Sequence, residues 1–217
     1  MTSFAFVLRK ESLGMPSAGG RYEYRVWPRR ALPAISDLHR DWTLEFAEKR
    51  ADIYLLGAHA MPELVKLRNG TRLEIKRRGR DHMGLQYWQV ALSQDFLLVP
   101  SALDQLAATF ALSEALPSSA GLSPAHLVAN LLRPPNRVKA RIVQKSRLLF
   151  RRGTCVAEIT HVRLDQRSWM TVAVEDPDPS SAAQAVDDLG LRYLPNQSYA
   201  DFLLAEPLLI AEPSLDR

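Results

Sequence analysis

The segment from Arg137 to Thr160 restricts what this chain can fold into more than any other part. It consists of two strand-like runs joined at Gly153, and in an extended chain every second side chain lies on the same face. Most positions on one face of the first run are cationic, whereas the other face is less polar and predicts packing on a core. The cations on the first face are Arg137, Lys139, Arg141, Lys145, Arg147 and Arg151.

This basic face has no counter-ions within its own segment, because no Asp or Glu occurs between Glu114 and Glu158. Like charges on one strand face repel each other, and a fold tolerates them where solvent or an anionic ligand supplies the missing charge. The pattern therefore indicates either a solvated outer sheet face or a binding site for an anion.

The charge of the whole chain favours a local anion site. The formal net charge is +4, and the cations are concentrated in 66–80 and 133–152, while the part beyond Glu175 is acidic. With 47% hydrophobic and 24% charged residues, the 217-residue chain is predicted to form one or at most two folded domains. A diffuse basic coat for nucleic acid is disfavoured.

Cysteine content and hydropathy exclude several classes of protein. The single cysteine, Cys155, excludes an internal disulfide and a cysteine-based zinc site, and its strand-like surroundings predict a packed apolar side chain. His82 and His126 have no metal-ligand partner at helical spacing. The apolar run near the N-terminus is interrupted by Arg9, and no run is long enough to cross a membrane, so we expect a cytoplasmic protein.

Strand-like and helix-like patterns alternate along the rest of the chain. Asn69 and Gly70 join two alternating runs and predict a tight β-hairpin. Further strands are predicted over 21–27, 51–57 and 168–176. Helices are predicted over 36–50, 101–115, 123–132 and 181–191. The chain is thus expected to consist of an arm (1–20), one domain (21–205) with a helical insertion at about 81–135, and a tail (206–217).

The charged strand faces must lie either in solvent or inside a closed barrel, because helices are available to cover the apolar faces. Acidic residues on separate strands, namely Glu23, Glu74, Glu158 and Glu175, accompany the cations, and this mixture favours the barrel. Isolated charges lose hydration when they are buried, so such an interior requires water and a ligand.

Several motifs, taken in order, resemble the CYTH or triphosphate tunnel metalloenzyme family. They are RYEYR at 21–25, VKLRNG and RLEIK within 65–76, VQKSRLLF and CVAEIT within 143–160, MTVAVE at 170–175 and LGLRYLPNQSYADFL at 189–203. The resemblance covers 21–203 and is weakest over 81–135. It implies an α+β fold in which an antiparallel eight-stranded β-barrel forms a tunnel, with flanking helices and a helical insertion.

The resemblance also implies roles for individual residues. The substrate, a small triphosphate-containing anion, would be bound by Arg25, Lys66, Arg68, Lys76, Lys145 and Arg147. A divalent metal, Mg²⁺ or Mn²⁺, would be held by Glu23, Glu158 and Glu175. The catalytic set would be Glu23, Glu158, Lys145 and Arg147.

The chain departs from the family pattern at three positions where the family carries acids. These positions hold Arg21, Thr160 and Ala173. Three carboxylates remain, and Mg²⁺ binds through as few as one or two protein acids. The departures therefore leave open whether the protein turns its substrate over.

Four functions follow from these patterns. A metal-dependent triphosphate phosphohydrolase comes first, and its alternative is a catalytically degenerate protein that binds phosphate or polyphosphate. An adenylate cyclase, the third possibility, would use the same metal and phosphate ligands. A nucleic-acid-binding module is disfavoured, because Tyr22 and Tyr24 lie on the opposite strand face from Arg21 and Arg25 and form no base-stacking platform with them. The identity of the triphosphate and the oligomeric state stay open.

Overall fold

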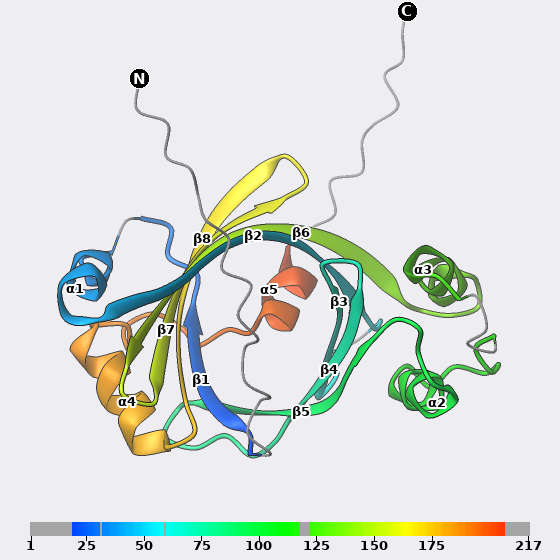
Figure 1. Cartoon of the computed structure of the whole chain (residues 1–217), viewed down its shortest axis with the longest axis horizontal. Coiled ribbons are helices and arrows are strands. Elements are labelled where there is room, and N and C mark those ends of the chain that lie inside the picture. Colours follow the sequence, from blue (N-terminus) through cyan, green and yellow to red (C-terminus); the bar gives the residue numbers. More distant parts are fainter. Residues whose placement is uncertain (1–18, 31, 59, 118–121, 207–217) are drawn as a thin grey trace, which may run out of the picture.

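The computed structural model of the chain describes residues 19–30, 32–58, 60–117 and 122–206, and its ring of strands is shown in Figure 1. Eight antiparallel strands form a closed barrel in the order β1-β5-β4-β3-β2-β6-β7-β8. The strands are β1 (Arg21–Val26), β2 (Thr43–Leu56), β3 (Glu63–Arg68), β4 (Arg72–Arg78), β5 (Gln86–Asp95), β6 (Lys139–Arg152), β7 (Cys155–Leu164) and β8 (Arg167–Asp176).

The barrel confirms the predicted α+β fold class and decides where the charged strand faces lie. Glu23, Lys66, Lys145 and Glu158 are all buried although they are ionisable, because they point into the barrel and line a common cavity. The apolar faces of the same strands point outward and are covered by helices. The alternative that the charged strand faces lie in solvent is therefore wrong.

Two helices lie outside the barrel on the same side (Figure 1): α1 (Ala34–Asp41) beside β2, and α4 (Pro179–Asp188) beside β1, β7 and β8. Val186 of α4 packs in one apolar cluster with Ile159 and Val174 of these strands. Cys155 belongs to the same cluster and is buried, and burial raises the pKa of its thiol to about 12. The prediction that this cysteine is a packed apolar side chain is confirmed.

The helices α2 (Pro100–Thr109) and α3 (Pro124–Leu132) lie on the opposite side of the barrel (Figure 1). Leu106 and Leu131 of these helices pack with Leu67 and Ile75, whose side chains form the outer face of β3 and β4. The oxygen of Ser123 accepts a hydrogen bond from the backbone N–H of His126 and so caps α3.

A fifth helix, α5 (Tyr199–Ala205), packs against side chains from the interior of the barrel rather than its outer face. Tyr199 and Phe202 share an apolar cluster with the buried Tyr54 and Val143. A capping box at Ser198 fixes the start of this helix. This helix therefore packs on the sheet from inside the barrel, where Ser198 and Tyr199 contribute to the cavity wall.

The predicted hairpin joins β3 and β4, which pair in the register Arg68 with Arg72. Asn69 and Gly70 have φ angles of 52° and 67°, the left-handed conformation that the two central residues of a type I′ turn require. Among the described helices, none is long and apolar enough to cross a membrane.

The predicted helix over 36–50 is wrong in its second half. The helix ends at Asp41, and Thr43–Leu56 forms a long strand that pairs with β6 from Thr43 to Leu56. Ser36 does not cap the helix, because the N-cap position is occupied by Pro33. The pairing with β6 overrides the local helical spacing of Leu38, Trp42 and Phe46, and the predicted strand over 51–57 is only the end of β2.

The predicted helical insertion over 81–135 is also too long. Gln86–Asp95 is the barrel strand β5, which pairs with β1 and β4, so the helical part extends only from α2 to α3. The helix predicted over 101–115 ends at Thr109. Residues 1–18 of the predicted arm and 207–217 of the predicted tail lie outside the described residues.

Candidate functional site

The barrel encloses a cavity of about 130 Å³. Every residue that the family resemblance implies as an anion or metal ligand lines this cavity: Glu23, Arg25, Lys66, Arg68, Lys76, Lys145, Arg147, Glu158 and Glu175. They come from six strands of the barrel, β1, β3, β4, β6, β7 and β8. Closure of the barrel brings together residues that are far apart in the sequence.

The basic row on β6 finds its counter-ions on the neighbouring strands. Nζ of Lys145 lies 3.0 Å from Oδ2 of Asp52 on β2. The guanidinium of Arg147 forms ion pairs with Glu48 on β2 and with Glu158 on β7. Because β6 lies between β2 and β7 in the sheet, its side chains face carboxylates from both sides. Lys145 and Arg147, which lack local counter-ions in the sequence, are thus paired with protein carboxylates in the fold.

Lys145 is enclosed by aromatic side chains as well as by Asp52. Its amine donates a hydrogen bond to the hydroxyl of Tyr54 at 2.7 Å and lies 3.9 Å from the ring centroid of Tyr199. Burial lowers the pKa of Lys145 well below its ordinary value, although Asp52 acts in the opposite direction. An anion near this amine would stabilise its charged form.

A second cluster of opposite charges lies on the β3–β4 hairpin. Lys66 and Arg68 both form ion pairs with Glu74, at 3.0 Å and 3.1 Å. Burial lowers the pKa of Lys66 to about 8. Burial raises the pKa of the Glu74 carboxyl, but Lys66 and Arg68 outweigh it and lower the pKa to about 2. Glu74 therefore stays ionised and holds both cations in place.

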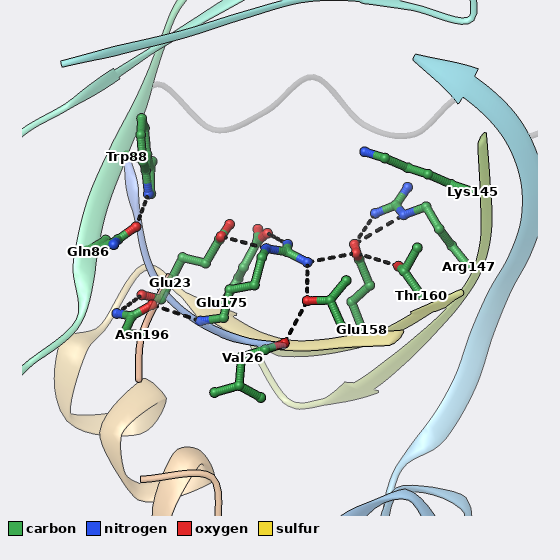
Figure 2. Close-up of polar contacts among 12 residues, drawn as sticks. Glu23, Val26, Gln86, Trp88, Lys145, Arg147, Glu158, Thr160, Glu175 and Asn196 are labelled. Atoms are coloured by element: carbon green, nitrogen blue, oxygen red, sulfur yellow. Dashed lines mark hydrogen bonds and ion pairs between the residues drawn. The ribbon is translucent and has the colours of Figure 1, made fainter. Parts of the chain in front are cut away.

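The carboxylates expected to bind a metal surround the guanidinium of Arg25. Nε of Arg25 lies 2.9 Å from Glu23, Nη1 lies 3.2 Å from Glu158 and Nη2 lies 3.9 Å from Glu175. In Figure 2 the carboxylates of Glu23, Glu175 and Glu158 extend from the strands toward the same space.

The pKa values at this end of the cavity reflect the same contacts. Burial raises the pKa of Glu158, but Arg147 and Arg25 outweigh it and hold this pKa well below its ordinary value. Burial also raises the pKa of Glu175, and the neighbouring Glu23 carboxylate adds to that rise. Carboxylates that lie this close do not all ionise with equal ease.

This arrangement does not fit a divalent metal at Glu23, Glu158 and Glu175. Within the described ranges, no group of three His, Cys, Asp or Glu side chains is arranged to hold a metal ion. Both oxygens of Glu158 already accept hydrogen bonds, Oε1 from Arg25 and from Thr160, and Oε2 from Arg147. Glu23 also accepts a hydrogen bond from Arg25, so two of the three carboxylates are occupied by protein donors.

Two of the three departures from the family pattern lie next to the carboxylates that surround Arg25. Oγ1 of Thr160 donates a hydrogen bond of 2.6 Å to Glu158, so a donor stands where the family carries an acid. Ala173 pairs in register with both Arg25 and Glu158. Arg21 lies at the start of β1, two positions before Glu23, and does not belong to the cavity lining given by the described residues.

Five residues of the cavity lining with polar or aromatic side chains were not predicted from the sequence: Arg50, Tyr54, Trp88, Ser198 and Tyr199. Arg50 was assigned to a helix, although the alternation of Glu48, Arg50 and Asp52 along one strand face was a usable signal. Tyr199 was assigned only to packing. Its buried hydroxyl lacks a hydrogen-bond partner among the described residues.

Comparisons with known proteins add distant likenesses. No protein-family model matches the sequence, and the search of curated proteins found no match. The described fold is similar to that of HpAC1 from Hippeastrum, a candidate adenylyl cyclase described with a dominant triphosphatase activity. The two sequences are 11% identical over 89% of this chain and 99% of that chain, and the TM-score is 0.48.

Two archaeal structures are similar at the same level. The PH1819 protein from Pyrococcus horikoshii OT3 has 11% identity over 85% of this chain and 98% of that chain, with a TM-score of 0.48. A conserved hypothetical protein from Pyrococcus furiosus has 12% identity over 78% and 90%, with a TM-score of 0.46. These likenesses are too distant to assign a function, which has to be inferred from the residues that line the cavity.

Proposed function

We propose that the protein binds a triphosphate-containing anion inside its barrel and hydrolyses it. The observation that carries this proposal is the convergence of six predicted phosphate ligands on one cavity. A triphosphate concentrates several negative charges in a short length, so it requires cations on more than one side. The cations lie on four different strands: Arg25 on β1, Lys66 and Arg68 on β3, Lys76 on β4, and Lys145 and Arg147 on β6.

The ion pairs inside the barrel favour a ligand of high charge. An anion that binds Lys145 or Lys66 has to replace Asp52 or Glu74 as the partner of that amine. A single weakly charged group would replace one favourable contact by another of similar strength. Several phosphate oxygens that act together can replace several contacts at once, because the cavity lining contains more cations than carboxylates.

Hydrolysis requires positioning and charge neutralisation rather than covalent chemistry by the protein. A water molecule adds to the terminal phosphorus while the bond from that phosphorus to the bridging oxygen breaks, which yields orthophosphate and the shortened anion. Arg147, held by Glu48 and Glu158, and Lys145 lie on the same face of β6 and can neutralise charge on neighbouring phosphate groups.

Binding without turnover is the second candidate. The observation that favours it is the small number of acids around the cavity, since Thr160 and Ala173 stand beside Glu158 and the remaining carboxylates contact Arg25. Binding to a nucleic-acid polymer is less consistent with the fold, because Arg25, Lys66 and Lys145 are buried inside the barrel, away from any surface that a duplex would contact.

The test is release of phosphate from inorganic triphosphate, ATP and thiamine triphosphate by the purified full chain, with Mg²⁺, with Mn²⁺ and with EDTA. The ATP reactions are also examined for a cyclic product, which would point to a cyclase. Lys145→Met should reduce release strongly, whereas Lys139→Met, an exposed lysine on the same strand, should not. A rise in melting temperature without phosphate release would refute hydrolysis, and the absence of both would refute the whole proposal.

A further inference from the structure

The position between Glu23, Glu158 and Glu175 is occupied by a positive charge that belongs to the protein itself. We infer that the guanidinium of Arg25 takes the place of a divalent metal, so that the protein binds no metal at these carboxylates and binds its anion without one. The statement about the anion rests on the proposed function, whereas the statement about the metal does not.

The first support is geometric. Arg25 contacts each of the three carboxylates, with the nearest nitrogen–oxygen distances at 2.9, 3.2 and 3.9 Å. The planar guanidinium directs its N–H groups toward several acceptors at once, and here each nitrogen faces a different carboxylate. The side chain of Arg25 is 4% exposed, so it does not sample solvent freely.

The second support is that the strand pairing leaves room for this guanidinium. Arg25 on β1 pairs with Ala173 on β8, and Ala173 in turn pairs with Glu158 on β7. The methyl side chain of Ala173 leaves space between its two larger neighbours. Thr171, two residues earlier on β8, accepts a hydrogen bond of 3.4 Å from Nη1 of Arg25. The guanidinium therefore has a place formed by three adjacent strands.

The third support is the cost of exchanging Arg25 for a metal. Mg²⁺ requires near-octahedral oxygen ligands at about 2.0–2.1 Å, so the carboxylates would have to close around the position between them. Arg25 would then be left beside a dication in a buried region, and Glu158 would lose its hydrogen bonds from Arg25 and Thr160. A divalent ion that enters the cavity would do so as a complex with the triphosphate, as part of the substrate.

Direct measurement of Mn²⁺ binding tests the inference without any need for activity. Free Mn²⁺ is quantified by electron paramagnetic resonance in titrations of the full chain, without triphosphate. The variants are Arg25→Gln, Glu158→Gln, the double variant that combines them, and Arg77→Gln as a control, because Arg77 is exposed on β4 and pairs with Glu63. Wild type and Arg77→Gln should bind no Mn²⁺, Arg25→Gln should bind one ion, and the double variant should lose it again.

Two outcomes would overturn the inference. One is binding of Mn²⁺ by the wild type that is lost in Glu158→Gln, because the carboxylates would then hold a metal in the presence of Arg25. The other is a folded Arg25→Gln that binds no Mn²⁺, because the carboxylates would then not be a metal site even without the arginine. Circular dichroism establishes whether Arg25→Gln folds, and the wild-type titration decides the question if it does not.

Calorimetric titration of inorganic triphosphate into the wild type, with and without EDTA, tests the part that concerns the anion. We expect the same affinity for triphosphate with and without EDTA. Loss of binding in EDTA would overturn the inference that the anion binds without a metal. Absence of triphosphate binding under both conditions would refute the proposed function, and the Mn²⁺ titrations would still decide the role of Arg25.

Discussion

Nζ of Lys145 lies 3.0 Å from Oδ2 of Asp52 inside the barrel, and these side chains are 2% and 0% exposed. The two residues face each other because β6 pairs with β2. The same relationship recurs between Lys66 and Glu74. Lys145 and Lys66 are thus already paired, so binding of an anion to either lysine is an exchange of partners and depends on how strongly the protein carboxylate competes.

Asp52→Asn should lower the stability of the ligand-free protein and increase the stabilisation by ligand. Removal of the carboxylate leaves the buried Lys145 amine without its partner, which lowers the free energy of unfolding by about 3 kcal/mol. The asparagine amide has the same shape as the carboxylate and retains one of its oxygens. Triphosphate would then replace the lost charge, so the rise in melting temperature that it causes should exceed that of the wild type. Asp95→Asn, at an exposed ion pair with Arg72, is the control and should behave as the wild type. If triphosphate raised the melting temperature of Asp52→Asn no more than that of the wild type, competition between Asp52 and the anion would be contradicted.

The affinity for triphosphate should fall as the pH rises above the pKa of Lys66. Burial lowers this pKa from the ordinary value of 10.5 to about 8, so the charged form that binds an anion is present below about 8 and lost above it. In Lys66→Arg the charge persists through this range. Calorimetric titrations below and above this pH should show a loss of affinity in the wild type that is absent in the variant. A parallel loss in both would assign the pH dependence to another group.

Arg147→Met should weaken triphosphate binding more than Arg151→Met. Arg147 lines the cavity, and a hydrogen bond to a charged group contributes about 1.5–3 kcal/mol, so the dissociation constant should rise at least tenfold. Arg151, four residues further along β6, pairs with Glu45 at the surface and provides the matched control. Equal dissociation constants for the two variants would show that the basic row does not contact the anion.

Tyr199→Phe should leave the stability of the ligand-free protein unchanged or slightly higher. The Tyr199 hydroxyl is buried and has no hydrogen-bond partner among the described residues, so its removal breaks no bond and relieves a desolvated group. A hydroxyl in the cavity wall can donate to a bound phosphate, so triphosphate affinity should fall in this variant. Tyr193→Phe, at an exposed position, is the control; a clear loss of ligand-free stability in Tyr199→Phe alone would show that the hydroxyl has a structural partner.

Two parts of the barrel were not recognised from local patterns. The segment over 43–50 continues the helical spacing of Leu38, Trp42 and Phe46, yet it is a strand because it pairs with β6. The strand β5 was hidden in a region rich in small residues and prolines, and it is specified by its pairing with β1 and β4. In both cases hydrogen bonds to distant strands outweigh a weak local preference.

The sequence by itself determined the features that depend on near neighbours. Period-two alternation identified the charged faces, the Asn69-Gly70 pair identified the hairpin, and apolar positions at helical spacing identified the helix over 123–132. The anion ligands were implied by the resemblance to the triphosphate tunnel family, and each of them lies on such a face.

Only the tertiary structure decided that these faces point inward, that Asp52 and Glu74 neutralise the lysines, and that Arg25 stands between Glu23, Glu158 and Glu175. The reason is physical. Alternation is a property of a single strand, whereas the closure of a barrel and the choice of ion partners depend on the register between strands that lie far apart in the chain.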